Sequence, residues 1–232
     1  MKILITGGKG FIGKNFINYI KKKKNITIFN LPRKIDLSKD NLVENYFKNS
    51  KNFNYIFHFA EVSGNKEWSK KNSFHQTLAN LKINLNIISA WAKYQRNAKF
   101  IFVSSIWSYP LGKTFLQEKD YWSGMLNPET RHFGYNKKIA TILLETAKAN
   151  FKLKATTLIL GTVYGPGDLS DHFIPTIIRK MKNEKKVLKV YGSGNESRDF
   201  IFIDDQVKGI FSHRNCNEEI INIGTGKLTS IK

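Results

Sequence analysis

Three glycines near the start of the chain have the spacing of a loop that binds phosphate. Gly7, Gly10 and Gly13 lie in the stretch TGGKGFIG at 6–13, at the end of an apolar run at 2–6. In such a loop the first glycine permits a tight turn, the second lets the backbone approach a pyrophosphate, and the third lets a helix pack closely on the strand. Free N–H groups at the start of that helix face the negative charge. The spacing predicts a dinucleotide-binding loop, with a plain structural turn as the alternative.

The scaffold that positions this loop is predicted from apolar runs that alternate with helical patterns. We expect strands at 2–6, 26–30, 54–59, 98–104 and 154–160, and helices at 11–22, 72–95 and 133–151. This alternation predicts an α/β fold, a doubly wound parallel sheet of the Rossmann type with helices on both faces.

After the glycines and proline at 165–167 the pattern becomes irregular. We expect helices near 172–183 and 205–212, and short strands near 187–191, 199–203 and 219–223. The division that this suggests is a dinucleotide-binding domain at 1–165 and a smaller, partial substrate-binding lobe at 166–232 that is interleaved with it.

The composition argues against a membrane-spanning or disulfide-linked chain. Hydrophobic residues make up 41% of the 232 residues, the mean hydropathy is -0.37, and no apolar run is long enough to cross a bilayer. The first residues have a strand pattern and lack the features of a signal peptide, so we expect a cytoplasmic protein. The single cysteine, Cys216, excludes an intramolecular disulfide framework and a multi-cysteine zinc site, and we predict no metal site.

The formal net charge of +20 raises the question of a nucleic-acid partner. The lysines are spread along the chain, and their densest run, 21–24, closes an expected helix, where positive charge suits the helix dipole. No helix-turn-helix, zinc-finger or aromatic RNA-binding motif accompanies the charge. We therefore expect no specific nucleic-acid partner, and an anionic small-molecule substrate would also gain from this field.

The end of the second expected strand bears on the choice between NAD and NADP. A carboxylate there would accept the hydroxyls of the adenosine ribose and favour NAD, but this chain has Asn30, with Arg33 close behind. Without a carboxylate, nothing there repels the 2′-phosphate of NADP, and Arg33 adds a cation that could bind it. The combination gives a mild preference for NADP. A surface role for Arg33 is the alternative.

Several motifs follow in an order that resembles the extended short-chain dehydrogenases, the family of NAD(P)-dependent sugar-nucleotide epimerases, dehydratases and reductases. Asp36-Leu37 is similar to the family's adenine contact, and HFAE at 58–61 is similar to its strand end beside the cofactor. The expected cofactor contacts are Gly7, Gly10, Phe11, Ile12, Gly13, Asn30, Arg33, Asp36, Leu37, Phe59, Ala60, Asn80 and Lys137.

Later motifs extend this resemblance over essentially the whole chain. They are SSIWSYP at 104–110, GYNK at 134–137, VYGP at 163–166, RDFI at 198–201 and NIGTG at 222–226. Within the family the likeness is greatest to enzymes of the GDP-L-fucose synthase type, although Trp107 stands where those enzymes have a cysteine. The family's usual length is greater, so we expect either a cut fragment or a reduced substrate lobe.

The resemblance implies that hydride moves between a sugar carbon and the nicotinamide while a tyrosine moves the proton. A lysine four residues later lowers the pKa of that phenol, and a serine or threonine hydroxyl binds the reacting oxygen. By this resemblance the serine is Ser105 and the lysine is Lys137, but the tyrosine position holds Phe133, which has no hydroxyl. Either the change was introduced to trap an inactive enzyme, or this is a natural homologue that has lost or rerouted its chemistry.

A shifted register is the alternative, with Tyr135 as the proton carrier and Lys138 as its partner. The spacing between them would be three instead of four, with Ile139 at the required lysine position. A separate alternative is that Phe133 is a core aromatic at the start of an amphipathic helix.

The substrate residues follow from the same resemblance. Ile106 and Trp107 stand where dehydratases of the family have an acidic pair, which disfavours dehydration and leaves epimerisation, reduction or oxidation. His172 is a proton shuttle or a surface histidine, and Arg198 binds the diphosphate or pairs with Asp204 or Asp205. The expected substrate contacts are Ser105, Trp107, Thr162, His172 and Arg198.

These expectations describe an NAD(P)-dependent epimerase or epimerase/reductase for a nucleoside diphosphate sugar, with Phe133 in place of its catalytic tyrosine. A non-catalytic NAD(P)-binding sensor is the alternative function. The family resemblance also implies a homodimer formed through the long helices at 72–95 and 133–151.

Overall fold

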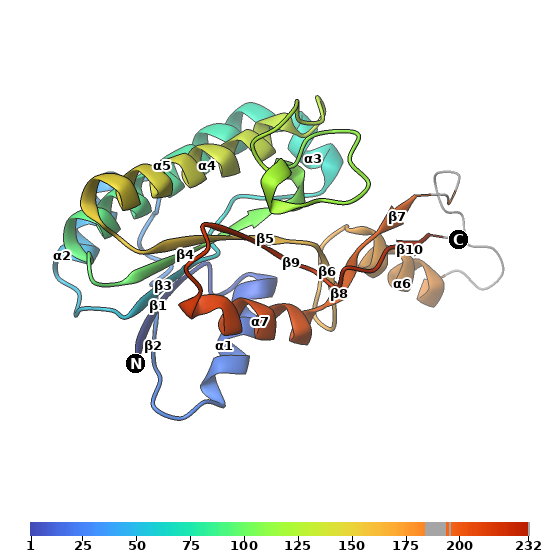
Figure 1. Ribbon diagram of the computed structural model, residues 1–232. Coiled ribbons are helices and arrows are strands. Elements are labelled where there is room, and N and C mark those ends of the chain that lie inside the picture. The colour runs from blue at the N-terminus through green and yellow to red at the C-terminus, as the bar shows by residue number, and fades with distance from the viewer. Residues whose placement is uncertain (184–193, 195, 232) are drawn as a thin grey trace.

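A six-stranded parallel sheet forms the centre of the computed structural model, which describes residues 1–183, 194 and 196–231 (Figure 1). The strands run in the order β2-β1-β3-β4-β5-β9, and every neighbouring pair is parallel. They are β1 (Lys2–Thr6), β2 (Thr27–Asn30), β3 (Tyr55–His58), β4 (Lys99–Ser105), β5 (Ala155–Leu160) and β9 (Ile220–Ile223). The predicted parallel sheet is confirmed.

Helices cover both faces of this sheet, which confirms the doubly wound architecture (Figure 1). One face carries α2 (Asp40–Lys48), α4 (Ser73–Tyr94) and α5 (Arg131–Phe151). The other face carries α1 (Phe11–Lys21) and α7 (Ile203–Ser212).

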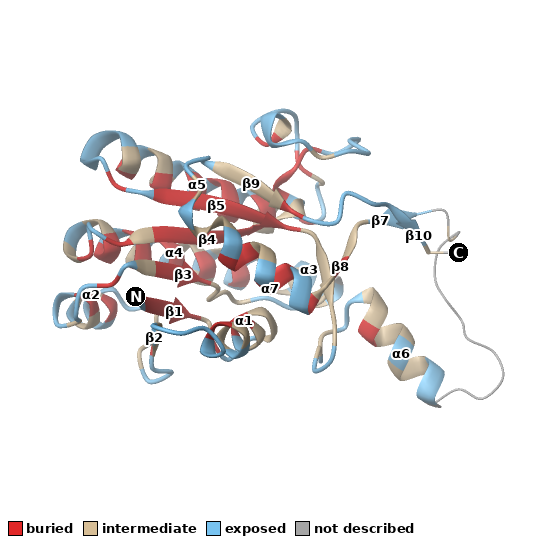
Figure 2. Cartoon of the chain, turned by 60° about the horizontal axis from the view of Figure 1, so that its bottom comes forward, coloured by how far each residue is buried: buried red, intermediate tan, exposed pale blue. Residues whose placement is uncertain are grey.

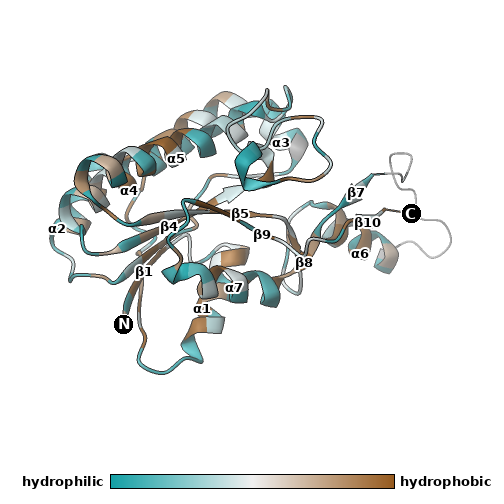
Figure 3. Ribbon diagram, in the orientation of Figure 1, coloured by the Kyte–Doolittle hydropathy of each residue, from teal (hydrophilic) through white to brown (hydrophobic). Residues whose placement is uncertain are grey.

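The alternation of side chains along β4 explains the two cores. Phe100 and Phe102 pack with the cluster under α4 and α5, whereas Ile101 and Val103 pack with the cluster under α1 and α7. A strand that is buried on both faces needs an almost continuous apolar sequence. Figures 2 and 3 show the consequence, because the central strands are both the most buried and the most hydrophobic part of the ribbon.

Smaller elements lie beyond the carboxyl ends of the sheet (Figure 1). They include α6 (Phe173–Asn183) and two short strand pairs, β6 (Thr162–Tyr164) with β8 (Phe200–Phe202) and β7 (Ser197–Arg198) with β10 (Thr229–Ser230). The remaining short helices are α3 (Lys66–Lys71), η1 (Ile106–Ser108), η2 (Glu118–Asp120) and η3 (His213–Asn215).

The helices differ from the sequence-based expectations in two places. The helix expected at 72–95 begins as α4 at Ser73 and is preceded by a separate helix, α3, whose N-terminus is capped by the Asn65 side chain through the N–H of Trp68. The sequence missed α2, because only Val43 and Phe47 of this polar helix are buried. The strand expected near 187–191 lies outside the described residues.

The part of the chain after 165 contributes directly to the main body. β9 completes the sheet beside β5, and α7 packs against α1. The division at 165 therefore stays a prediction. Among the described residues, no helix has both the length and the apolar character needed to cross a membrane.

Candidate functional site

The carboxyl ends of β1, β3 and β4 bring the predicted site residues to one edge of the sheet. The chain passes from β1 to β2 on one side of β1 and then to β3 on the other. This reversal makes the space outside β1 and β3 the topological switch point, where open α/β sheets bind their ligands.

The glycine loop closes tightly on its neighbours. Gly7 has a φ of +69°, and a Cβ at this position would lie 2.5 Å from the backbone nitrogen of Ala60. A Cβ on Gly13 would lie 2.3 Å from the carbonyl oxygen of Gly7. Larger residues at either position would therefore force the loop away from the end of β3 or from α1.

The start of α1 fits a diphosphate. No side chain caps this helix, and its first turn contains no acidic residue. A Cβ on Gly10 would approach only the Gly7 carbonyl, at 3.3 Å, so the outer side of the loop is open. The N–H groups of the first turn are therefore free to receive a pyrophosphate.

The residues expected at the adenosine end lie along the neighbouring edge. The amide of Asn30, at the end of β2, lies against Gly8, because a Cβ on Gly8 would be 2.4 Å from Asn30 Oδ1. Arg33 and Asp36 are exposed. Hydrogen bonds from the Ser38 side chain and backbone lower the pKa of the Asp36 carboxyl.

A hydrogen-bonded chain joins β1 to the loop after β3. The N–H of Ala60 donates to Thr6 Oγ1, which is 2.6 Å from Nδ1 of His58. His58 Nε2 lies 3.0 Å from Oδ1 of Asn84, so the network places the imidazole proton on Nε2. Burial lowers the pKa of His58 to about 4, which keeps the ring neutral.

Asn80, expected at the cofactor, holds the same loop in place. Its amide oxygen accepts from the N–H of Val62 at 2.8 Å, and its amide nitrogen donates to the carbonyl of Val62 at 2.9 Å. Asn80 thus fixes the backbone that follows Phe59 and Ala60.

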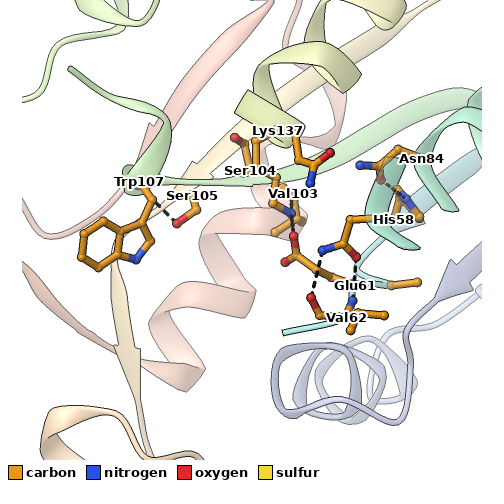
Figure 4. Close-up of polar contacts among 12 residues, drawn as sticks. His58, Glu61, Val62, Asn84, Val103, Ser104, Ser105, Trp107 and Lys137 are labelled. Carbon is orange, nitrogen blue, oxygen red and sulfur yellow. Dashed lines mark hydrogen bonds and ion pairs between the residues drawn. The ribbon is translucent and has the colours of Figure 1, made fainter. Parts of the chain in front are cut away.

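Lys137 lies at the centre of the expected catalytic group (Figure 4). Its Nζ donates to the Val103 carbonyl at 2.9 Å and forms an ion pair with Oε1 of Glu61, also at 2.9 Å. The ammonium lies over the ring of Phe102 at 5.1 Å and over the ring of Phe133 at 5.6 Å. The lysine and the phenylalanine four residues before it therefore face each other on adjacent turns of α5.

Ser105 ends β4 on the same edge. Its Oγ accepts from the N–H of Trp107 at 3.3 Å, and the indole of Trp107 is 42% exposed. The structure therefore brings Ser105, Lys137 and Phe133 to the carboxyl end of β4, beside the loop after β3.

Tyr135 and Lys138 have different surroundings. Tyr135 is 42% exposed. Lys138 Nζ lies over the rings of Tyr121 and Trp122, at 5.4 and 5.6 Å. The two residues are therefore not arranged as a tyrosine–lysine pair.

The remaining substrate candidates lie among the elements beyond the sheet. Thr162 begins β6, the exposed His172 directly precedes α6, and the exposed Arg198 ends β7. A hydrogen bond of 2.9 Å between Asn65 and Asp171 connects the loop after β3 to this region. Among the described residues, no ion pair joins Arg198 to Asp204 or Asp205.

The NIGTG segment at 222–226 has mainly structural contacts. The carboxylate of Asp199 accepts from the N–H groups of Thr225 and Gly226 and from the Thr225 hydroxyl. The Tyr109 hydroxyl donates to the side chain of Asn222 at 2.7 Å. These contacts fix the turn after β9.

Glu61 is the site residue that sequence reasoning missed. Its side chain is 18% exposed, and burial raises the pKa of its carboxyl, an effect that the charge of Lys137 only partly offsets. The available signal was a carboxylate in an otherwise apolar run directly after a buried strand, where the family motif has a small residue.

A family model and several known proteins match most of this chain. The family model described as "NAD dependent epimerase/dehydratase family" matches residues 3–224. GDP-L-colitose synthase of Yersinia pseudotuberculosis is 27% identical over 98% of this chain and 77% of its own length. GDP-L-fucose synthase of Dictyostelium discoideum is 27% identical over 94% of this chain and 71% of its own length.

A solved structure gives a similar result. GDP-mannoheptose C4 reductase from Campylobacter jejuni, solved with NADP bound, has a TM-score of 0.86 and is 26% identical to this chain. The match covers 99% of this chain and 80% of that one.

Proposed function

Because this chain belongs to the NAD-dependent epimerase/dehydratase family, we propose that it binds NAD(P) and a nucleoside diphosphate sugar in an epimerase or epimerase/reductase site that lacks the proton-transferring hydroxyl. The cofactor, when bound, supplies the hydride acceptor or donor for a sugar carbon. The residues of the chain hold the diphosphate, orient the sugar oxygen and surround the nicotinamide end.

The packing of Phe133 against Lys137 is the observation that carries this proposal. A phenol at position 133 would place its hydroxyl beside an ammonium that is already fixed by the Val103 carbonyl and the Glu61 carboxylate. That charge would lower the pKa of the phenol. Ser105, at the end of the adjoining strand, would bind the reacting oxygen.

The cofactor preference and the assembly are further parts of the proposal. Asn30 and Arg33 support a mild preference for NADP, because no carboxylate stands at the end of β2. Exposed apolar side chains on α4 and α5 support a homodimer formed through these helices, and they are Leu78, Leu85, Ile139 and Ile142.

The substitution Phe133→Tyr tests the proposed function. The variant should convert a suitable GDP-, UDP-, dTDP- or CDP-sugar, followed by chromatography of the sugar and by cofactor absorbance, at a rate at least about 100 times that of the wild type, since a positioned proton carrier contributes about 10²–10⁴-fold. Absence of turnover across that panel, in a variant that still binds cofactor, would contradict the proposal.

A non-catalytic NAD(P)-binding sensor is the second candidate. It is supported by the ion pair between Glu61 and Lys137, because an enzyme of this type uses its lysine to activate a tyrosine. A sensor would bind the dinucleotide without a sugar nucleotide, and Phe133→Tyr would leave it inactive.

A further inference from the structure

Glu61 places a negative charge in the half of the site that faces β4. It follows β3 directly, and its carboxylate points toward Lys137 of α5 (Figure 4). The glycine loop lies at the end of β1, on the other side of β3 from β4. A dinucleotide whose pyrophosphate meets the glycine loop therefore extends its adenosine half toward β2 and its other half toward Glu61 and Ser105.

Packing alone does not account for this carboxylate. Transfer of a carboxylate from water into a largely buried site is costly, and burial raises its pKa accordingly. Lys137 already has a hydrogen-bond acceptor in the Val103 carbonyl and lies over two aromatic rings. What the carboxylate adds is charge balance, because it turns an isolated cation into a neutral pair.

The charge balance matters because the two oxidation states of nicotinamide differ by one positive charge. The oxidised ring is cationic and the reduced ring is neutral, so a nearby uncompensated ammonium disfavours only the oxidised form. A neutral pair removes that penalty. Both charged side chains are largely buried, 6% exposed for Lys137 and 18% for Glu61, so their charges are screened less than at the surface.

We propose that Glu61 determines which oxidation state of the cofactor this chain binds, by cancelling the charge of Lys137 and thereby favouring oxidised NAD(P). The inference rests on the proposed function, because it requires the nicotinamide to lie beside Lys137. It makes Glu61 a cofactor-selecting residue that acts through its charge, whether or not the chain turns over a sugar.

The test compares the affinities of oxidised and reduced cofactor. The dissociation constants of NADP⁺ and NADPH, and of NAD⁺ and NADH, are measured by calorimetry on the wild type and on Glu61→Gln. The ratio of oxidised to reduced dissociation constants should rise about tenfold in Glu61→Gln. The matched control is Glu218→Gln, since Glu218 is exposed at the opposite end of the sheet, just before β9, and its ratio should stay at the wild-type value.

Two further measurements make the outcome unambiguous. Lys137→Met removes the cation, so its ratio should stay at the wild-type value or fall, depending on whether Glu61 takes up a proton, and this variant decides the question if Glu61→Gln does not fold. An unchanged ratio in folded Glu61→Gln, or a raised ratio in Lys137→Met, with both cofactor forms still bound, would overturn the inference and leave the proposed function intact. Failure of the wild type to bind either form would overturn the proposed function itself.

Discussion

The glycine loop and the surroundings of Lys137 lie on neighbouring strands of one sheet, yet they follow their family pattern to different degrees. At the end of β1 the spacing, the left-handed Gly7 and the uncapped helix all suit a diphosphate. At the ends of β3 and β4 a phenylalanine, a glutamate and a tryptophan replace expected residues at 133, 61 and 107. The contrast is that the glycine loop keeps the family pattern, whereas the surroundings of Lys137 depart from it at three positions.

The largest effect is expected from a change that disrupts the glycine loop. Gly13→Ala places a Cβ against the Gly7 carbonyl, which is backbone and cannot turn aside. We expect NAD(P) affinity to fall about 100-fold or more, measured by calorimetry, because the loop must open to admit the methyl group. In Gly161→Ala, where the nearest atom is 3.5 Å away, affinity should be unchanged. Equal affinities in Gly13→Ala and the wild type would show that the loop does not bind the cofactor.

The next largest effect is expected at His58, whose side-chain contacts connect Thr6 at the end of β1 with Asn84 of α4. Its pKa in the folded chain is about 4, below the ordinary value of 6.5, because the ring is buried. Only the unfolded chain takes up the proton between these values, so the free energy of unfolding should fall as the pH drops from about 6.5 to about 4, by about 3 kcal/mol, and then level off.

Urea unfolding across this pH range measures the effect. His58→Gln should remove that part of the pH dependence, whereas the same change at the exposed His172 should retain it. An identical pH profile for His58→Gln and the wild type would contradict the buried, neutral assignment.

A smaller effect is expected at Asn80. Asn80→Leu leaves the N–H and carbonyl of Val62 without their partners, so we expect the free energy of unfolding to fall by about 2 kcal/mol. Asn18→Ala, at an exposed position on α1, serves as the control and should change it by less than about 0.5 kcal/mol. Cofactor affinity should also weaken in Asn80→Leu but not in Asn18→Ala, because the loop after β3 that Asn80 holds carries Ala60 and Glu61. Wild-type stability in this variant would contradict that role.

The smallest effect is expected at Tyr135. Tyr135→Phe removes the hydroxyl of a residue that is 42% exposed and is not among the contacts of Lys137 described above. The change should therefore alter neither cofactor affinity nor stability by a measurable amount. The same substitution in a Phe133→Tyr background should leave the restored turnover intact. Loss of turnover there would favour the shifted register with Tyr135 as proton carrier.

The sequence predicted what depends on local spacing. The glycine loop, five strands of the sheet and the covering of both faces follow from periodicity and from residues close together in the chain, whereas the sixth strand, β9, was expected in the smaller lobe. The family resemblance, including the likeness to GDP-L-fucose synthase, was also predicted from motif order and is confirmed by the comparisons.

The sequence did not reveal what depends on contacts between distant segments. Glu61 and Lys137 belong to a loop and a helix that meet only when β3 and β4 pair, so neither motif alone indicates their ion pair. Asn80 has the expected position but binds the Val62 backbone. The sequence did not predict the polar helix α2, because its two buried residues are too few to give a clear hydrophobic periodicity.

The central claim is that this site lacks one hydroxyl. The most direct measurement follows conversion of the same nucleotide sugars by chromatography, with cofactor absorbance recorded alongside, for the wild type and Phe133→Tyr, after both have been shown to bind NAD(P) equally. The account predicts turnover in Phe133→Tyr alone, with its rate lost again in Phe133→Tyr combined with Lys137→Met. Turnover by the wild type at the rate of the variant, or none in either protein despite bound cofactor and sugar, would contradict it.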